Sequence, residues 1–140
     1  MSHRAFGVLV VLLAASCRGD TGSIPDVSGT WSYGAPSLKS GALECGLTGV
    51  TLILDQTGAS FVGTYAGGVL TCDSSSESGF IGEVVGGTVA GPQVQFDFDN
   101  TDWTNSGRLA GTTMTGQTIW TVGIGSTVYQ LVGTWTATKN

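Results

Sequence analysis

The chain carries few side chains of the kinds that catalyse reactions. Its only histidine is His3, which lies in an N-terminal segment that we expect to be removed. Without histidine, Ser-His-Asp and Cys-His mechanisms are excluded. The commonest general base near neutral pH and the commonest metal ligand are absent with it. We therefore predict that the protein is not an enzyme and has no catalytic residue, metal ion or cofactor.

The densest group of carboxylates lies in residues 97–102, where Asp97, Asp99 and Asp102 occur close together. Alternating carboxylates can bind Ca²⁺, but an EF-hand loop starting at Asp97 requires Gly and Glu where this chain has Asp102 and Arg108. Two of these acids could also form a glycosidase pair. We favour a third interpretation, a solvated strand face that leads into a turn.

The N-terminus has the composition of an export signal. Met1–Arg4 carries positive charge, Ala5–Ala15 is almost wholly apolar, and small residues precede Cys17. This order is typical of a secretory signal peptide. The apolar run has about half of the roughly 20 residues needed to span a bilayer. We expect residues 1–16 to be a signal peptide and the protein to be exported.

The segment Leu13–Cys17 resembles the lipobox of bacterial lipoproteins, with Ala14 where that family usually has Leu, Val or Ile. The resemblance implies that Cys17 becomes a lipidated N-terminus (palmitate among its acyl chains) that holds the protein on a membrane. Arg18 differs from the Asp that resembles an inner-membrane retention signal, so we expect the outer membrane if the host has one. The alternative is ordinary cleavage after Ser16, which leaves a free thiol.

Cys45 and Cys72 are the two remaining cysteines. In an oxidising compartment they are expected to form a disulfide bond, whose loop closure is worth about 3 kcal/mol. A zinc site is not expected, because zinc needs three or four clustered ligands.

Residues 17–140 contain four basic and ten acidic residues. Four scattered cations form no patch that could neutralise phosphates, so we predict no nucleic-acid partner. Residues 17–26 are small, polar and contain Pro25, which indicates a flexible tether. One domain then covers residues 27–140. Its oligomeric state is left open.

The pattern of this domain predicts an all-β fold. Apolar and polar residues alternate, as in 94–99, and Gly-containing clusters separate the runs. We expect about eight strands, near 29–33, 50–56, 60–66, 69–73, 80–89, 93–99, 106–122 (two strands with a turn near Gly111) and 128–138. Residues 34–49 are expected to be a loose connection, and 73–79 a polar hairpin loop. Sequential strands favour a single small antiparallel up-and-down barrel, with a β-sandwich as the alternative.

A Gly-Thr-aromatic triplet recurs at residues 29–31, 63–65 and 133–135. The first copy resembles the Gly-x-Trp opening of lipocalins, and size and strand count are similar to the lipocalin and avidin barrels, the calycins. In lipocalins a late Arg usually packs on this Trp, whereas the last strand here has Lys139. Avidins carry a late Asp, whereas no acid follows Asp102. The resemblance implies a calycin-like barrel and not biotin binding.

Aromatic residues are the candidate ligand-binding groups, since they could line a barrel interior. The candidates are Trp31, Tyr65, Trp103, Trp120 and Trp135. They could equally form a packed core. The first interpretation predicts an envelope lipoprotein that binds a small apolar or amphipathic ligand, with inward glycines such as Gly63 and Gly133 leaving room. The second predicts a non-catalytic structural or interaction module with a filled barrel.

Overall fold

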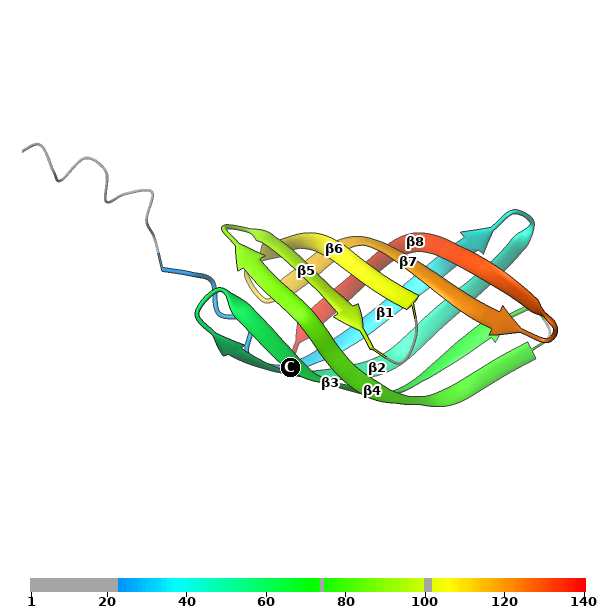
Figure 1. The fold of residues 1–140 in the computed structure, drawn as a ribbon, viewed down its shortest axis with the longest axis horizontal. Coiled ribbons are helices and arrows are strands. Elements are labelled where there is room, and N and C mark those ends of the chain that lie inside the picture. The colour runs from blue at the N-terminus through cyan, green and yellow to red at the C-terminus, as the bar shows by residue number, and fades with distance from the viewer. Residues whose placement is uncertain (1–22, 74, 100–101) are drawn as a thin grey trace, which may run out of the picture.

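A computed structural model describes residues 23–73, 75–99 and 102–140. Eight antiparallel strands follow one another in chain order, and β1 pairs with β8 to close a barrel (Figure 1). The barrel is therefore confirmed over the sandwich. The strands are β1 (Gly29–Ser40), β2 (Leu43–Thr57), β3 (Ser60–Cys72), β4 (Ser75–Ala90), β5 (Gln93–Phe98), β6 (Asp102–Ala110), β7 (Thr113–Ile124) and β8 (Thr127–Lys139).

Alternation of side chains decides which face of each strand is buried. In β5, Val94, Phe96 and Phe98 are buried while Gln95 and Asp97 are exposed. Successive side chains of a strand point to opposite faces, so every second residue enters the interior. The predicted turn near Gly111 is present, and Gly111 has a φ of 61°, in the left-handed region. Within the described ranges no helix is long and apolar enough to cross a membrane.

The prediction of a loose connection at 34–49 was wrong, because these residues form the paired ends of β1 and β2. The separate strands expected at 60–66 and 69–73 are one strand, β3. Most of the predicted 73–79 loop likewise belongs to β4. Glycines explain these differences: Gly49, Gly67 and Gly68 take positive φ inside the strands. Such residues bend a strand or form a bulge while pairing continues on both sides.

The bends also change which residues face inward. In β2, Leu47 and Val50 are both buried, and in β3 the same holds for Tyr65 and Leu70. These odd spacings break strict alternation. The irregularities restore apolar residues to the interior on both sides of the bend, so the core continues along the whole barrel.

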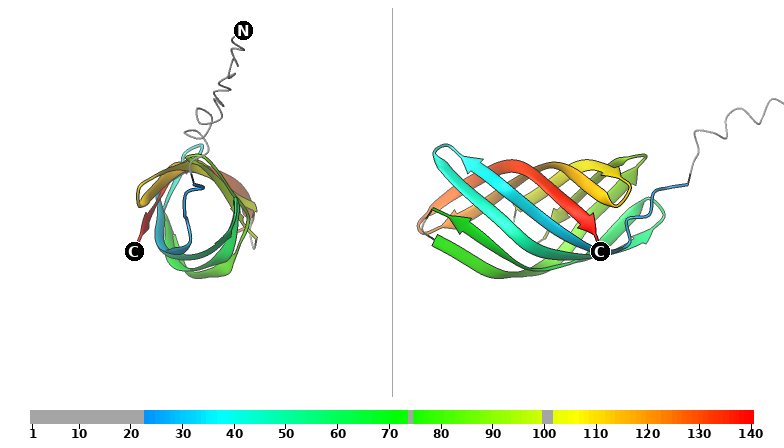
Figure 2. Two further views of the ribbon diagram at one scale, coloured as in Figure 1. Left: turned by 90° about the vertical axis from the view of Figure 1, so that its left-hand side faces the viewer. Right: turned by 180° about the vertical axis from the view of Figure 1, so that it is seen from behind.

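The two ends of the barrel differ. At the proximal end, where β1 begins, residues 23–28 cross the opening (Figure 2, left). Val27 is fully buried there and its N–H donates to Gln56 Oε1 at 2.6 Å, while Gln56 Nε2 donates to the Pro25 carbonyl at 2.9 Å. The other end, called the distal end below, carries the β1–β2, β3–β4, β5–β6 and β7–β8 turns (Figure 1).

Candidate functional site

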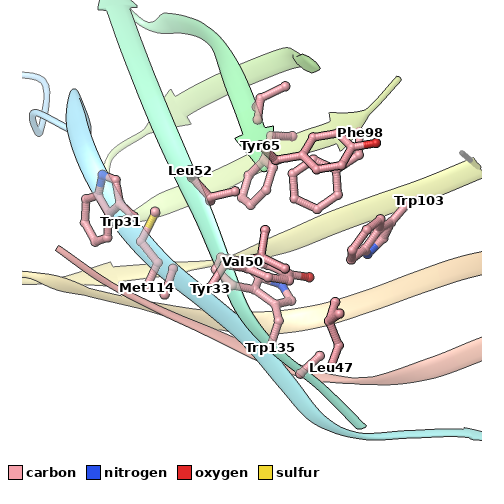
Figure 3. Packing of buried hydrophobic residues seen from close by; sticks show 14 of the residues in the cluster. Trp31, Tyr33, Leu47, Val50, Leu52, Tyr65, Phe98, Trp103, Met114 and Trp135 are labelled. Atoms are coloured by element: carbon pink, nitrogen blue, oxygen red, sulfur yellow. The ribbon is translucent and has the colours of Figure 1, made fainter. Parts of the chain in front are cut away.

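All five candidate aromatic residues lie in the barrel interior. Trp31, Trp120 and Trp135 are 0% exposed, Trp103 is 1% exposed and Tyr65 is 2% exposed. They come from five strands, β1, β3, β6, β7 and β8, and four of them are labelled in Figure 3. The barrel therefore brings together residues that are up to 104 positions apart, from Trp31 to Trp135.

Within the described part of the chain, four of these rings, all except Trp31, contact other aromatic rings of the interior. Trp103 and Trp120 stack with ring centroids 4.2 Å apart and an interplanar angle of 13°. Phe98 lies 4.3 Å from Trp103 and 4.4 Å from Tyr65. Tyr33 stacks on Trp135 at 5.6 Å. At such distances the rings are in van der Waals contact, so these side chains occupy the space in which a ligand between them would lie (Figure 3).

The inward glycines do not leave the space that the ligand hypothesis needs. A Cβ atom at Gly63 would overlap the backbone oxygen of Ile53, and one at Gly133 would overlap that of Ser37. The neighbouring strand has moved into the place of the missing side chain. At the paired glycines Gly107 and Gly116, the Trp135 ring and the adjacent backbone occupy the corresponding positions. Glycine serves close strand approach here.

Several polar groups in the interior form hydrogen bonds with one another. The Tyr33 hydroxyl donates to Asn105 Oδ1 at 2.6 Å, and Trp103 Nε1 donates to Thr118 Oγ1 at 2.8 Å. Burial raises the pKa of Tyr33 above the ordinary tyrosine value, against the smaller opposing effect of hydrogen bonds from Thr118 and Trp103. The phenol therefore stays neutral at physiological pH. It serves packing and hydrogen bonding rather than proton transfer.

Sequence reasoning missed Asn105 and Thr118, which are 3% and 0% exposed. Each occupies an inward position of its strand, β6 or β7, directly opposite the other. The period-2 pattern does place them inward, since Trp103 and Trp120 lie two residues away. Their polar character masked that signal.

Trp31 lies against the residues that close the proximal end. Its Nε1 donates to the Val27 carbonyl at 2.9 Å. The Lys139 ammonium lies 5.8 Å from the centroid of the Trp31 ring, within the range of a cation–π contact. Lys139, at the end of the last strand, thus lies over the tryptophan of the first strand.

The predicted disulfide is confirmed. Cys45 and Cys72 are directly opposite each other on β2 and β3, with Cα atoms 4.2 Å apart, and their sulfur atoms are bonded. Both residues are buried near the distal end. Because the flanking residues are already paired strands, the bond links two strands of the wall and does not hold down a loop. Cys17, the predicted lipidation site, lies outside the described residues.

The described acidic residues of 97–102 lie on the outer face and at the end of β5 and at the start of β6. Asp97 lies on the outer face of β5, opposite Thr104. Asp99 Oδ1 accepts a hydrogen bond from the Glu83 N–H at 2.8 Å, which ties the end of β5 to β4. Among the described residues, no group of three or more His, Cys, Asp or Glu side chains is placed to hold a metal ion.

One hollow opens at the distal end, with a volume of about 200 Å³. It is lined by Leu70, Cys72, Ser75, Ser76, Glu77, Gly123, Ile124 and Gly125. The β3–β4 side therefore supplies the polar lining, and the β7–β8 turn supplies the opposite side. The chemistry is that of a small amphipathic recess, and sequence reasoning had assigned its polar side to a hairpin loop.

The chain matches no protein-family model, no curated protein and no solved structure. The residues and geometry described above are therefore the basis for its functional interpretation.

Proposed function

We propose that this protein is a non-catalytic module of the cell envelope, anchored by lipid at Cys17, whose calycin-like barrel is a filled core. It acts by presenting its outer surface and distal end to other molecules. The observation that carries this proposal is the burial of the five candidate aromatic residues, each at most 2% exposed, four of them in direct contact with other aromatic rings of the interior. The alternative function, binding of an internal apolar ligand, requires those rings to separate.

The position of the N-terminus supports an orientation on the membrane. The described chain enters at the proximal end, where Val27 and Gln56 fasten it to the barrel. Residue 23 follows Cys17 by six positions, and an extended chain covers at most about 3.6 Å per position. An anchor at Cys17 therefore holds the proximal end within about 20 Å of the bilayer. The distal end is then directed away from the membrane.

Native mass spectrometry of the full protein purified from its host tests the filled barrel. We expect the mass of the processed chain with its lipid and no further bound molecule. A stoichiometric apolar compound that leaves only on denaturation would overturn the proposal in favour of internal ligand binding.

The anchor is tested separately by Cys17→Ala, with Cys45→Ala as a matched cysteine control. We expect Cys17→Ala to move the exported protein from the membrane to the soluble fraction, because it removes the acylated side chain. Cys45→Ala should leave the protein on the membrane. An unmodified Cys17 thiol at the mature N-terminus would contradict the lipid anchor.

A further inference from the structure

The barrel wall is incomplete at the distal end. β5 and β6 lie between β4 and β7, but β5 ends at Phe98, which pairs with Val84. β4 extends from Val84 for nine more residues, to Ser75. Over this length no residue of β5 pairs with β4. The short β5–β6 hairpin is visible in Figure 1, where the tips of β3–β4 and β7–β8 reach further.

Side chains of β4 and β7 meet across this gap. The rings of Phe80 and Trp120 make an edge contact with centroids 5.6 Å apart. The distal hollow begins beyond this contact: Glu77 precedes Phe80 by three residues, and Gly123 follows Trp120 by three. The aromatic contact therefore separates the hollow from the filled core.

The hollow has an apolar base and one carboxylate in its wall. Leu70 is 2% exposed and Cys72 is 4% exposed, and Ile124 packs against the core from the opposite side. Glu77 pairs directly with Leu70, so the two side chains share the inward face of the sheet. Glu77 is exposed to solvent, and a charged group in the hollow can therefore reach its carboxylate without burial of an unpaired charge.

Size and charge define the occupant. The volume of about 200 Å³ is below the roughly 300–1,000 Å³ of sites for drug-sized ligands. It suits a group as large as one amino-acid side chain. Charges at this end are predominantly negative: the basic residue is Lys39, and the acidic residues are Glu44, Asp73, Glu77, Asp99 and Asp102. A cation is therefore favoured over an anion of the same size.

We propose that the distal hollow binds an ammonium group carried on a short apolar stem, with the stem on Leu70 and Ile124 and the ammonium at Glu77. This inference rests on the proposed function, since it gives the presented end its binding site. The chemistry is that of a lysine side chain of a partner protein or of a free alkylamine.

The test uses three probes with the same stem and different charge: n-butylamine, n-butanol and butyrate. The full exported protein is titrated in detergent, and backbone amide shifts are followed by NMR. We expect shifts at residues 75–77 and 123–125, with the amine about threefold tighter than the alcohol, as for an exposed ion pair, and butyrate the weakest. Added salt should reduce the preference for the amine.

Glu77→Gln should make the amine and the alcohol bind equally, because it removes the charge while keeping the shape. Glu83→Gln is the matched control. Glu83 lies on the same strand, is exposed and pairs with Thr64 outside the hollow. This variant should keep the threefold preference. Equal binding of all three probes to the original protein, shifts confined to other surfaces, or an unchanged preference in Glu77→Gln would each overturn the proposal.

Nα-acetyl-lysine N-methylamide distinguishes the two sources of the ammonium group. Binding as tight as that of n-butylamine supports a lysine presented by a partner protein, and binding of the free amine alone supports a small molecule. The indole N–H signals of Trp31 and Trp135 in the same spectra report on the core. If the amine does not bind and these signals stay in place, the distal site is contradicted and the filled barrel is not. If a probe moves these signals, the filled barrel is contradicted.

Discussion

Replacing Trp103 and Trp120 by Phe, one at a time, compares the stability contributions of two buried indole groups, of which one donates a hydrogen bond to a described residue and the other does not. Both are at most 1% exposed and they stack on each other, so each substitution removes the same atoms from the interior. Trp103 Nε1 donates to Thr118 Oγ1 at 2.8 Å. Trp120 Nε1 is buried and has no hydrogen-bond partner among the described residues.

The magnitudes follow from these partners. Trp103→Phe loses a hydrogen bond worth about 1 kcal/mol. Trp120→Phe removes a buried unsatisfied donor, whose burial costs about 1–3 kcal/mol. Trp103 also contacts more rings than Trp120, so the packing loss acts in the same direction. Trp103→Phe should therefore be less stable than Trp120→Phe by about 2–4 kcal/mol from the hydrogen bonds alone.

Urea unfolding of the oxidised protein, followed by circular dichroism, measures the difference. Thr118→Val, alone and combined with Trp103→Phe, is the control. The double-mutant cycle should give a coupling of about 1 kcal/mol between Trp103 and Thr118. Equal stability of the two Phe variants, or a less stable Trp120→Phe, would refute the assignment of these hydrogen bonds.

Three further predictions concern the wall, the disulfide and the buried phenol. Gly116→Ala should destabilise the barrel by about 3 kcal/mol or more, because its methyl group would overlap the Ser106 backbone. Gly123→Ala, with no atom within 4 Å of the added carbon and no positive φ, should change stability little in the same urea assay. Cys45→Ala should lower the free energy of unfolding by about 2–4 kcal/mol through loss of the 27-residue closure, and thiol titration of the denatured lipidated protein should find no free cysteine. The raised pKa of Tyr33 favours the neutral phenol in the folded state. The contribution of this group to folding stability is therefore fully present below the unfolded-state pKa of about 10, and it is lost as pH rises through the folded-state pKa. Spectrophotometric titration should therefore show a step that appears only with unfolding, and Tyr33→Phe should reduce its amplitude by one tyrosine. Ionisation of every tyrosine in the folded barrel would contradict the burial.

The sequence allowed much of the fold to be predicted because apolar alternation reports which face of a strand is buried. Alternation could not distinguish a barrel from a sandwich, since both use it. Closure depends on pairing of β1 with β8, and the Gly-Thr-Trp copies at 29–31 and 133–135 indicated that pairing. Residues 34–49 were misassigned because glycines that bend a paired strand resemble glycines of a loop.

The state of the interior could not be derived from residue types. Gly63 and Gly133 suggest space when side-chain volume alone is considered, yet neighbouring backbone occupies it. The distal hollow was equally hidden, because it depends on how far β4 and β7 extend beyond β5 and β6. Strand ends and interstrand distances are tertiary properties, and local sequence patterns specify them weakly.

The indole N–H signals of the four tryptophans test the filled barrel most directly. The measurement is a proton–nitrogen correlation spectrum of the full protein, recorded with and without excess N-phenyl-1-naphthylamine as an apolar probe. Trp31, Trp103 and Trp135 each donate to a partner inside the barrel, so displacement of the core would move their signals. The account predicts that these three signals stay in place. Saturable shifts of all three at one probe per chain would contradict it and establish an internal ligand site.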